Sequence, residues 1–284
     1  MRLPLIIISL LLLVSCDVRA DSADAPSNLS QPDSVPQRAA CYAGAGTARF
    51  RRSGAGSADY DLTGPQRVEA ARKSKLATLK AMLKARGLSW PPRQVFLRGY
   101  KKEGVLEVWA SNKPRGALTH LATYEICYAS GGPGPKTRQG DSQVPEGFYR
   151  LDYYKRDSSY FLAARINYPN LRDRRLGHTG GAIMIHGACV SIGCVSMGDE
   201  GIQEIWLLAR AAHRAGRAVH VHLFPSCDLD PMIKEAGSSR LKNFWAQLKR
   251  GRDLFDQDKV VPSIGVDKWG NYTFPRIQPR RSDM

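Results

Sequence analysis

Acidic residues are scarce in this sequence, and no apolar run reaches the ~20 residues that a membrane-spanning helix needs. There are 26 Asp and Glu against 42 Lys and Arg, which gives a formal net charge of +16. Such an excess draws a protein to anionic surfaces, although a solvated basic surface without a dedicated partner is an equal alternative. The basic residues are scattered and no nucleic-acid-binding motif occurs, so nucleic acid is not expected as a partner. Internal repeats are also absent.

The longest apolar run, Leu3 to Val14, is typical of the central part of a secretory signal peptide. We therefore expect residues 1–20 to be a signal peptide, cleaved after Val18-Arg19-Ala20. Leu13 to Cys16 also fits a lipobox, in which case the signal ends before Cys16 and that residue carries a lipid anchor. Both alternatives predict an exported protein of the periplasm or cell envelope, in contact with a membrane only if Cys16 is lipidated.

Cysteines are few, and their number is informative. Six are present, and without Cys16 five remain, an odd number for an exported protein. At least one reactive thiol is therefore expected. Cys127 with Cys189 and Cys41 with Cys227 are candidate disulfide pairs, but neither pairing follows from the sequence. A buried thiol at Cys189 is the alternative.

The pattern along the chain indicates a mostly β fold with peripheral α-helices. Residues 21–60 are rich in Ser, Ala, Gly, Asp and Pro and are expected to form a disordered tether. Residues 61–92 form a helical lead segment, with a helix from about Pro65 to Arg86, and 276–284 form a polar tail. Strands are predicted at 95–100, 105–111, 118–128, 148–154, 182–186 and 219–224, with a strand pair at 265–274, a basic loop at 168–181, and helices at 199–216 (capped by Asp199) and 241–248.

One short segment carries residues suited to covalent catalysis. His186 ends an apolar strand, and Cys194 follows eight residues later. A thiol becomes a good nucleophile when a nearby imidazole favours its ionised form. Gly193 allows main-chain amides around Cys194 to face an oxyanion, and Gly187 permits a turn after the histidine, whose carbonyl we expect to hold the imidazole tautomer. Core packing of a histidine beside a cysteine is the alternative interpretation.

The same segment resembles the signature of a known family. His186-Gly187 and Ser191-Ile192-Gly193-Cys194 are similar to the His-Gly and Ser/Thr-x-Gly-Cys pattern of the YkuD-type L,D-transpeptidases. The YafK branch of that family is the most similar, through motifs at 127–136, 138–141, 145–149 and 244–249. The resemblance covers residues 93–275 and implies a β-sandwich-like L,D-transpeptidase catalytic domain.

The resemblance also implies a reaction. Cys194 would attack a diaminopimelate carbonyl of a peptidoglycan stem peptide, with His186 as its base and no bridge through the thiol. Transfer of the acyl group to an amine would make the protein a transpeptidase. Transfer to water would make it an amidase that releases a stem-peptide-linked envelope protein, such as a covalently anchored lipoprotein.

Two positions depart from the commoner family pattern. Ile192 stands where a second histidine is usual, and Ser196 stands where an arginine is usual. Recognition of the substrate is therefore assigned to Ser191, Lys136 and Arg138, with solvated loop charges as the alternative for the two basic residues.

Other functional classes are less well supported. His220 and His222 alternate on a strand and would share a face, but no third or fourth zinc ligand has suitable spacing, so no metal or other cofactor is expected. A non-catalytic peptidoglycan-binding module would not need the thiol of Cys194. In a papain-like protease the histidine would lie far downstream of the cysteine, whereas His186 precedes it closely.

Overall fold

The computed structural model describes residues 50–51 and 60–275, all of which lie in one compact unit that spans residues 33–284. The predicted signal peptide, Cys16, Cys41, most of the predicted tether and the tail at 276–284 lie outside the described residues. Within the described ranges, no helix is both long and apolar enough to cross a membrane.

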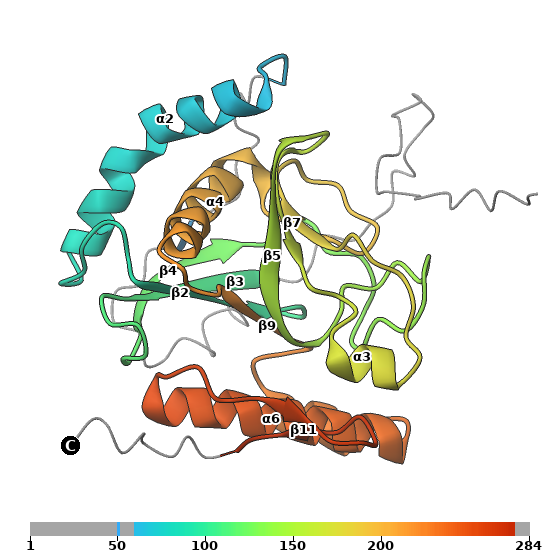
Figure 1. Ribbon diagram of the computed structural model, residues 1–284. Coiled ribbons are helices and arrows are strands. Elements are labelled where there is room, and N and C mark those ends of the chain that lie inside the picture. The colour runs from blue at the N-terminus through green and yellow to red at the C-terminus, as the bar shows by residue number, and fades with distance from the viewer. Residues whose placement is uncertain (1–49, 52–59, 276–284) are drawn as a thin grey trace, which may run out of the picture. The chain divides into compact units, whose positions relative to one another are not determined.

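A nine-stranded sheet forms the body of the domain, in the order β1-β4-β3-β2-β9-β5-β6-β7-β8 (Figure 1). Its strands are β1 (Phe50–Arg51), β2 (Gln94–Tyr100), β3 (Val105–Ser111), β4 (Thr119–Glu125), β5 (Gly147–Ser158), β6 (Phe161–Ile166), β7 (Met184–His186), β8 (Val195–Ser196) and β9 (His220–Phe224). A second, two-stranded sheet pairs β10 (Gly265–Val266) with β11 (Tyr272–Thr273). The long strand β5 joins the two halves of the large sheet, because its first residues pair with β9 and its later residues with β6.

Helices lie at the periphery, as the sequence predicted. They are α2 (Gly64–Lys84), α3 (Leu171–Arg175), α4 (Gly198–Arg214), α5 (Leu229–Lys234) and α6 (Ser239–Asp258). Helix α2 begins with a capping box between Thr63 and Gln66, which satisfies the first free N–H groups of the helix. The expected helix at Pro65 to Arg86 is thereby confirmed, as is the mostly β architecture.

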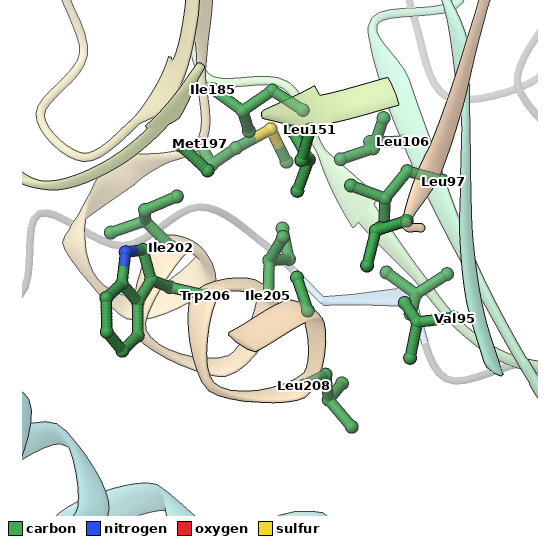
Figure 2. Close-up of a cluster of buried hydrophobic side chains, with 14 of the residues drawn as sticks. Val95, Leu97, Leu106, Leu151, Ile185, Met197, Ile202, Ile205, Trp206 and Leu208 are labelled. Atoms are coloured by element: carbon green, nitrogen blue, oxygen red, sulfur yellow. The ribbon is translucent and has the colours of Figure 1, made fainter. Parts of the chain in front are cut away.

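The two faces of the central strands carry different cores. Alternation along β2 and β9 sends Val95 and Leu97 to the face covered by α4, where they pack with Ile205 and Leu208 (Figure 2). The opposite face packs against α6, which Figure 1 shows on the other side of β2 and β9 from α4. Each buried Leu or Ile side chain stabilises the fold by ~1.5–3 kcal/mol.

Several elements differ from the sequence-based expectation. Strand β6 was missed, and the loop expected at 168–181 contains α3, which begins at a capping box between Asn170 and Asp173. Helix α5 was also missed, and α6 extends far beyond 241–248 because Phe255 on its last turns is buried. Asp199 does not cap α4. The N-cap is Met197, and the carboxylate of Asp199 instead accepts a hydrogen bond from another loop.

Candidate active site

His186 and Cys194 lie at the meeting point of two short parallel strands. His186 is the last residue of β7, and Cys194 directly precedes β8. The register pairs Ile185 with Val195 and His186 with Ser196, so Cys194 lies one residue before the paired part of β8, beside the start of β7. Both residues are buried, with 1% and 3% of their surface exposed. The N–H of Met184 donates a hydrogen bond to the Cys194 sulfur at 3.4 Å.

The imidazole of His186 is fixed in one tautomer. Its Nδ1 lies 2.5 Å from the carbonyl oxygen of Gly187, which only accepts, so Nδ1 carries the proton. Nε2 is therefore the basic nitrogen of the neutral ring, and it is buried without a hydrogen-bond partner among the described residues. Burial lowers the pKa of His186 below its usual 6.5, against smaller raising effects of the Gly187 carbonyl and of Asp199. Tyr160 stacks on the ring at 4.6 Å.

Glycine is required at two positions of this segment for different reasons. At Gly187 a Cβ would lie 2.6 Å from Oδ1 of Asp199 and 2.7 Å from the carbonyl oxygen of Tyr160, so the requirement is space. At Gly193 the backbone has φ of +120°, a conformation that L side chains rarely adopt. These two glycines permit the close chain packing around the His186 ring and the Cys194 thiol.

Ser191 holds the backbone of Cys194. Its hydroxyl accepts a hydrogen bond from the Cys194 N–H at 2.7 Å and lies at the same distance from the Cys194 carbonyl oxygen, to which it donates. The N–H of Cys194, expected to face an oxyanion, is therefore engaged in this structure. An oxyanion role for Gly193 and a substrate contact for Ser191 stay predictions.

Comparisons with known proteins identify the domain. A family model described as the L,D-transpeptidase catalytic domain, YkuD, matches residues 101–221. The chain is 41% identical over 175 residues to the "Putative L,D-transpeptidase YafK" of Escherichia coli strain K12, which covers 61% of this chain and 70% of that protein. The chain belongs to the L,D-transpeptidase family.

Two solved structures are more distantly similar to this L,D-transpeptidase domain. The helical cell shape determining protein Pgp2 from Campylobacter jejuni is 17% identical, with a TM-score of 0.39 over 67% of this chain and 80% of that chain. The L,D-transpeptidase from Xylanimonas cellulosilytica is 12% identical, with a TM-score of 0.28 over 62% and 97%.

A disulfide fixes the loop that precedes Cys194 in this L,D-transpeptidase domain. Cys127 and Cys189 are bridged, which confirms one of the two candidate pairs. The N–H of Cys127 also donates to the carbonyl of Ser196 at 2.8 Å, so the bridge and β8 are tied together. Cys194 is a thiol outside this bridge. The other candidate pair involves Cys41, which lies outside the described residues.

The two basic residues expected at the substrate differ in environment. Lys136 is buried, and its Nζ contacts the Asp141 carboxylate at 2.5 Å and the carbonyl oxygen of Arg138 at 2.9 Å. Burial raises the pKa of Asp141, but hydrogen bonds from Lys136 and the loop backbone outweigh it and bring the pKa to about 2. A solvated charge is therefore the wrong alternative for Lys136, whereas the side chain of Arg138 is exposed. A substrate contact for either residue stays a prediction.

Asp199 and Tyr60 belong to the site and were missed from the sequence. The Tyr60 hydroxyl lies 2.9 Å from Oδ1 and 3.1 Å from Oδ2 of Asp199. Oδ1 also accepts a hydrogen bond from the N–H of Ala188 at 2.8 Å, in the turn that holds the His186 ring. The guanidinium of Arg67 binds the carbonyl of Tyr60 and secures this contact. A separation of 139 residues between Tyr60 and Asp199 leaves no local sequence signal.

His220 and His222 lie on one face of β9, as expected from their alternation, with ring centroids 6.5 Å apart. The described residues contain no group of three or more His, Cys, Asp or Glu side chains arranged to hold a metal ion.

Proposed function

We propose that this protein is a peptidoglycan L,D-transpeptidase in which Cys194 is the nucleophile and His186 its general base. The observation that carries the proposal is the fixed tautomer of His186, which leaves a buried, basic Nε2 at the end of β7, the strand against which the Cys194 sulfur lies. A general base needs its lone pair available at the operating pH, and the lowered pKa of His186 provides it. Membership of the L,D-transpeptidase family supports the same chemistry.

The proposed reaction proceeds through a thioester. Nε2 of His186 takes the thiol proton, and the Cys194 sulfur bonds to the carbonyl carbon of a stem-peptide diaminopimelate residue. The bond between that carbon and the leaving amine breaks, and the amine departs with the proton from the imidazolium. An acceptor amine then attacks the thioester carbonyl, loses its proton to His186 and releases the Cys194 thiol.

The acceptor amine belongs either to a second stem peptide, which gives a cross-link, or to an envelope protein such as a lipoprotein, which gives an anchored protein. Both acceptors belong to the cell envelope, in agreement with the signal peptide expected at residues 1–20 and with the excess of 42 Lys and Arg over 26 Asp and Glu. The mass of the mature protein tests export and lipidation of Cys16.

Covalent labelling tests the nucleophile. The intact mass of the protein is measured after incubation with a carbapenem, a β-lactam whose carbonyl accepts a thiolate. We expect one adduct on the wild type and on Val190→Ala, an exposed position of the same loop, and none on Cys194→Ala. An adduct of equal yield on Cys194→Ala would remove Cys194 from the mechanism.

Analysis of treated sacculi tests the acceptor. Isolated sacculi are incubated with wild type or Cys194→Ala, and the muropeptides and released proteins are quantified. New cross-links or newly attached protein that depend on Cys194 are the expected result. Release of stem-peptide-linked protein without new bonds would replace the acceptor amine with water and make the protein an amidase.

A further inference from the structure

A cavity of about 720 Å³ lies on the face of the sheet that α6 covers. Its floor is formed by β2, β9 and β5, and the segment 260–266 after α6 forms one of its walls. Its volume is in the range of small-molecule sites in proteins. Neither Cys194 nor His186 lines it, so it is separate from the candidate active site.

Two residues of the floor have polar atoms that the fold leaves unsatisfied. His222 is 1% exposed, and neither of its ring nitrogens has a hydrogen-bond partner among the described residues. The ring is held edge-on between Phe96 and Phe148, each at 4.7 Å between centroids. Gln94 is 8% exposed, and its Oε1 is likewise buried without a partner in the described chain. Unpaired buried polar groups cost free energy, and such groups beside a cavity are commonly paired by a ligand or water.

Three arginines line the same cavity from different elements. Arg150 on β5 pairs in register with His220, and Arg217 lies on the segment that precedes β9. Arg115 lies on the loop between β3 and β4. None of the three forms a salt bridge within the described ranges, and no Asp or Glu lines the cavity. Guanidinium groups with no acidic neighbour are suited to carboxylate or phosphate groups.

We propose that this cavity is a second binding site, for a small organic anion whose carboxylate or phosphate meets the three arginines. The uncharged part of the ligand lies against the apolar wall formed by residues such as Val261 and Ile264, above Gln94 and His222. Carboxylate and phosphate share the chemistry that the arginines recognise. The proposal does not depend on the reaction at Cys194.

The test titrates the full chain, labelled with ¹⁵N, with three probes that share one apolar ring: cyclohexanecarboxylate, cyclohexyl phosphate and uncharged cyclohexanol. The ring resonances of His222 and His220 are followed by NMR at constant ionic strength. We expect at least one of the two anions to shift the His222 resonances saturably, and cyclohexanol to bind about tenfold more weakly or not at all. Binding of only one of the two anions would show whether the cavity takes a carboxylate or a phosphate, and binding of both would show that it accepts either group.

Matched variants distinguish binding in this cavity from general attraction of anions to a basic protein. Arg150→Gln/Arg217→Gln should raise the dissociation constant of the bound anion about tenfold, which corresponds to ~1.4 kcal/mol. Arg214→Gln, on the exposed side of α4 and outside the cavity, and Cys194→Ala should leave it unchanged. The proposal is wrong if neither anion shifts His222 saturably, or if the double variant and Arg214→Gln weaken binding equally. All variants are at exposed or partly exposed positions except Cys194, and their thermal unfolding is compared with the wild type.

Discussion

The hydroxyl of Ser191 bonds both backbone groups of Cys194, the N–H and the carbonyl, each at 2.7 Å. A single side chain three residues upstream thereby sets the position of the sulfur relative to His186. Ser191 thus has a positioning role that does not require contact with substrate.

Ser191→Ala should slow acylation of Cys194, because the backbone that carries the sulfur loses both bonds. A misplacement of about 1 Å costs on the order of 100-fold in rate, so we expect a loss of roughly 10- to 100-fold. Ser191→Thr keeps the hydroxyl and should recover most of the rate. The measurement is the rate of carbapenem adduct formation, and wild-type rates in Ser191→Ala would contradict the positioning role.

Asp199→Asn should change the pH dependence of the same reaction. Burial lowers the pKa of His186, and the charge of Asp199 raises it in part. Without that charge the pKa falls further, so the acid limb of the acylation rate, already below pH 6.5 in the wild type, moves to lower pH. The plateau should fall about tenfold, because the imidazolium formed during catalysis loses ~1.4 kcal/mol of stabilisation.

Tyr60→Phe is the matched control for this variant. It removes the hydrogen bonds to Asp199 but keeps the charge of the carboxylate. Its acid limb should therefore lie closer to the wild type than that of Asp199→Asn. Identical profiles for wild type and Asp199→Asn would mean that the charge does not act on His186.

Elements with strong periodicity could be predicted from the sequence. Helix α2 shows apolar residues at helical spacing, and β3 occupies the predicted residues Val105–Ser111. Strand β6 escaped prediction because it shows no polar alternation and contains Ala163 and Ala164, a residue type that is depleted in strands. The helix predicted at 241–248 was too short. Helix α6 continues to Asp258, and Phe255 on its last turns belongs to the same buried face.

The residues of the candidate site also differ in whether the local sequence could predict them. The local segment from His186 to Cys194 contains the two residues of the proposed chemistry, so a pattern of nine residues suffices to find them. The Tyr60 contact with Asp199 spans 139 residues and depends on how α2 and α4 pack. Asp199 looked like a helix cap because acidic residues favour helix starts, and only the turn at Ala188 reveals its other role.

Loss of the disulfide between Cys127 and Cys189 should destabilise the domain. The bridge joins residues 62 positions apart, and the chain-entropy model assigns such a loop about 4 kcal/mol. Cys127→Ser/Cys189→Ser should lower the free energy of unfolding in urea by roughly 2 to 4 kcal/mol. The acylation rate should fall as well, because Cys189 anchors the loop before Cys194. Equal denaturation midpoints for this variant and the wild type would contradict a stabilising bridge.

His222 should make the stability of the protein sensitive to acid. Burial, with smaller contributions from His220 and Arg98, holds its pKa well below 6.5, whereas an unfolded histidine titrates near ~6.5. Below about pH 6.5 the unfolded chain binds more protons than the native one, so the free energy of unfolding falls as the pH drops. His222→Phe keeps a ring between Phe96 and Phe148 but cannot bind a proton. The variant should lose less stability than the wild type between about pH 7 and pH 5, measured by urea unfolding. His213→Gln, at an exposed histidine, is the control and should show the same pH dependence of stability as the wild type. If the free energy of unfolding of His222→Phe falls with pH as steeply as that of the wild type, His222 does not couple folding to proton binding.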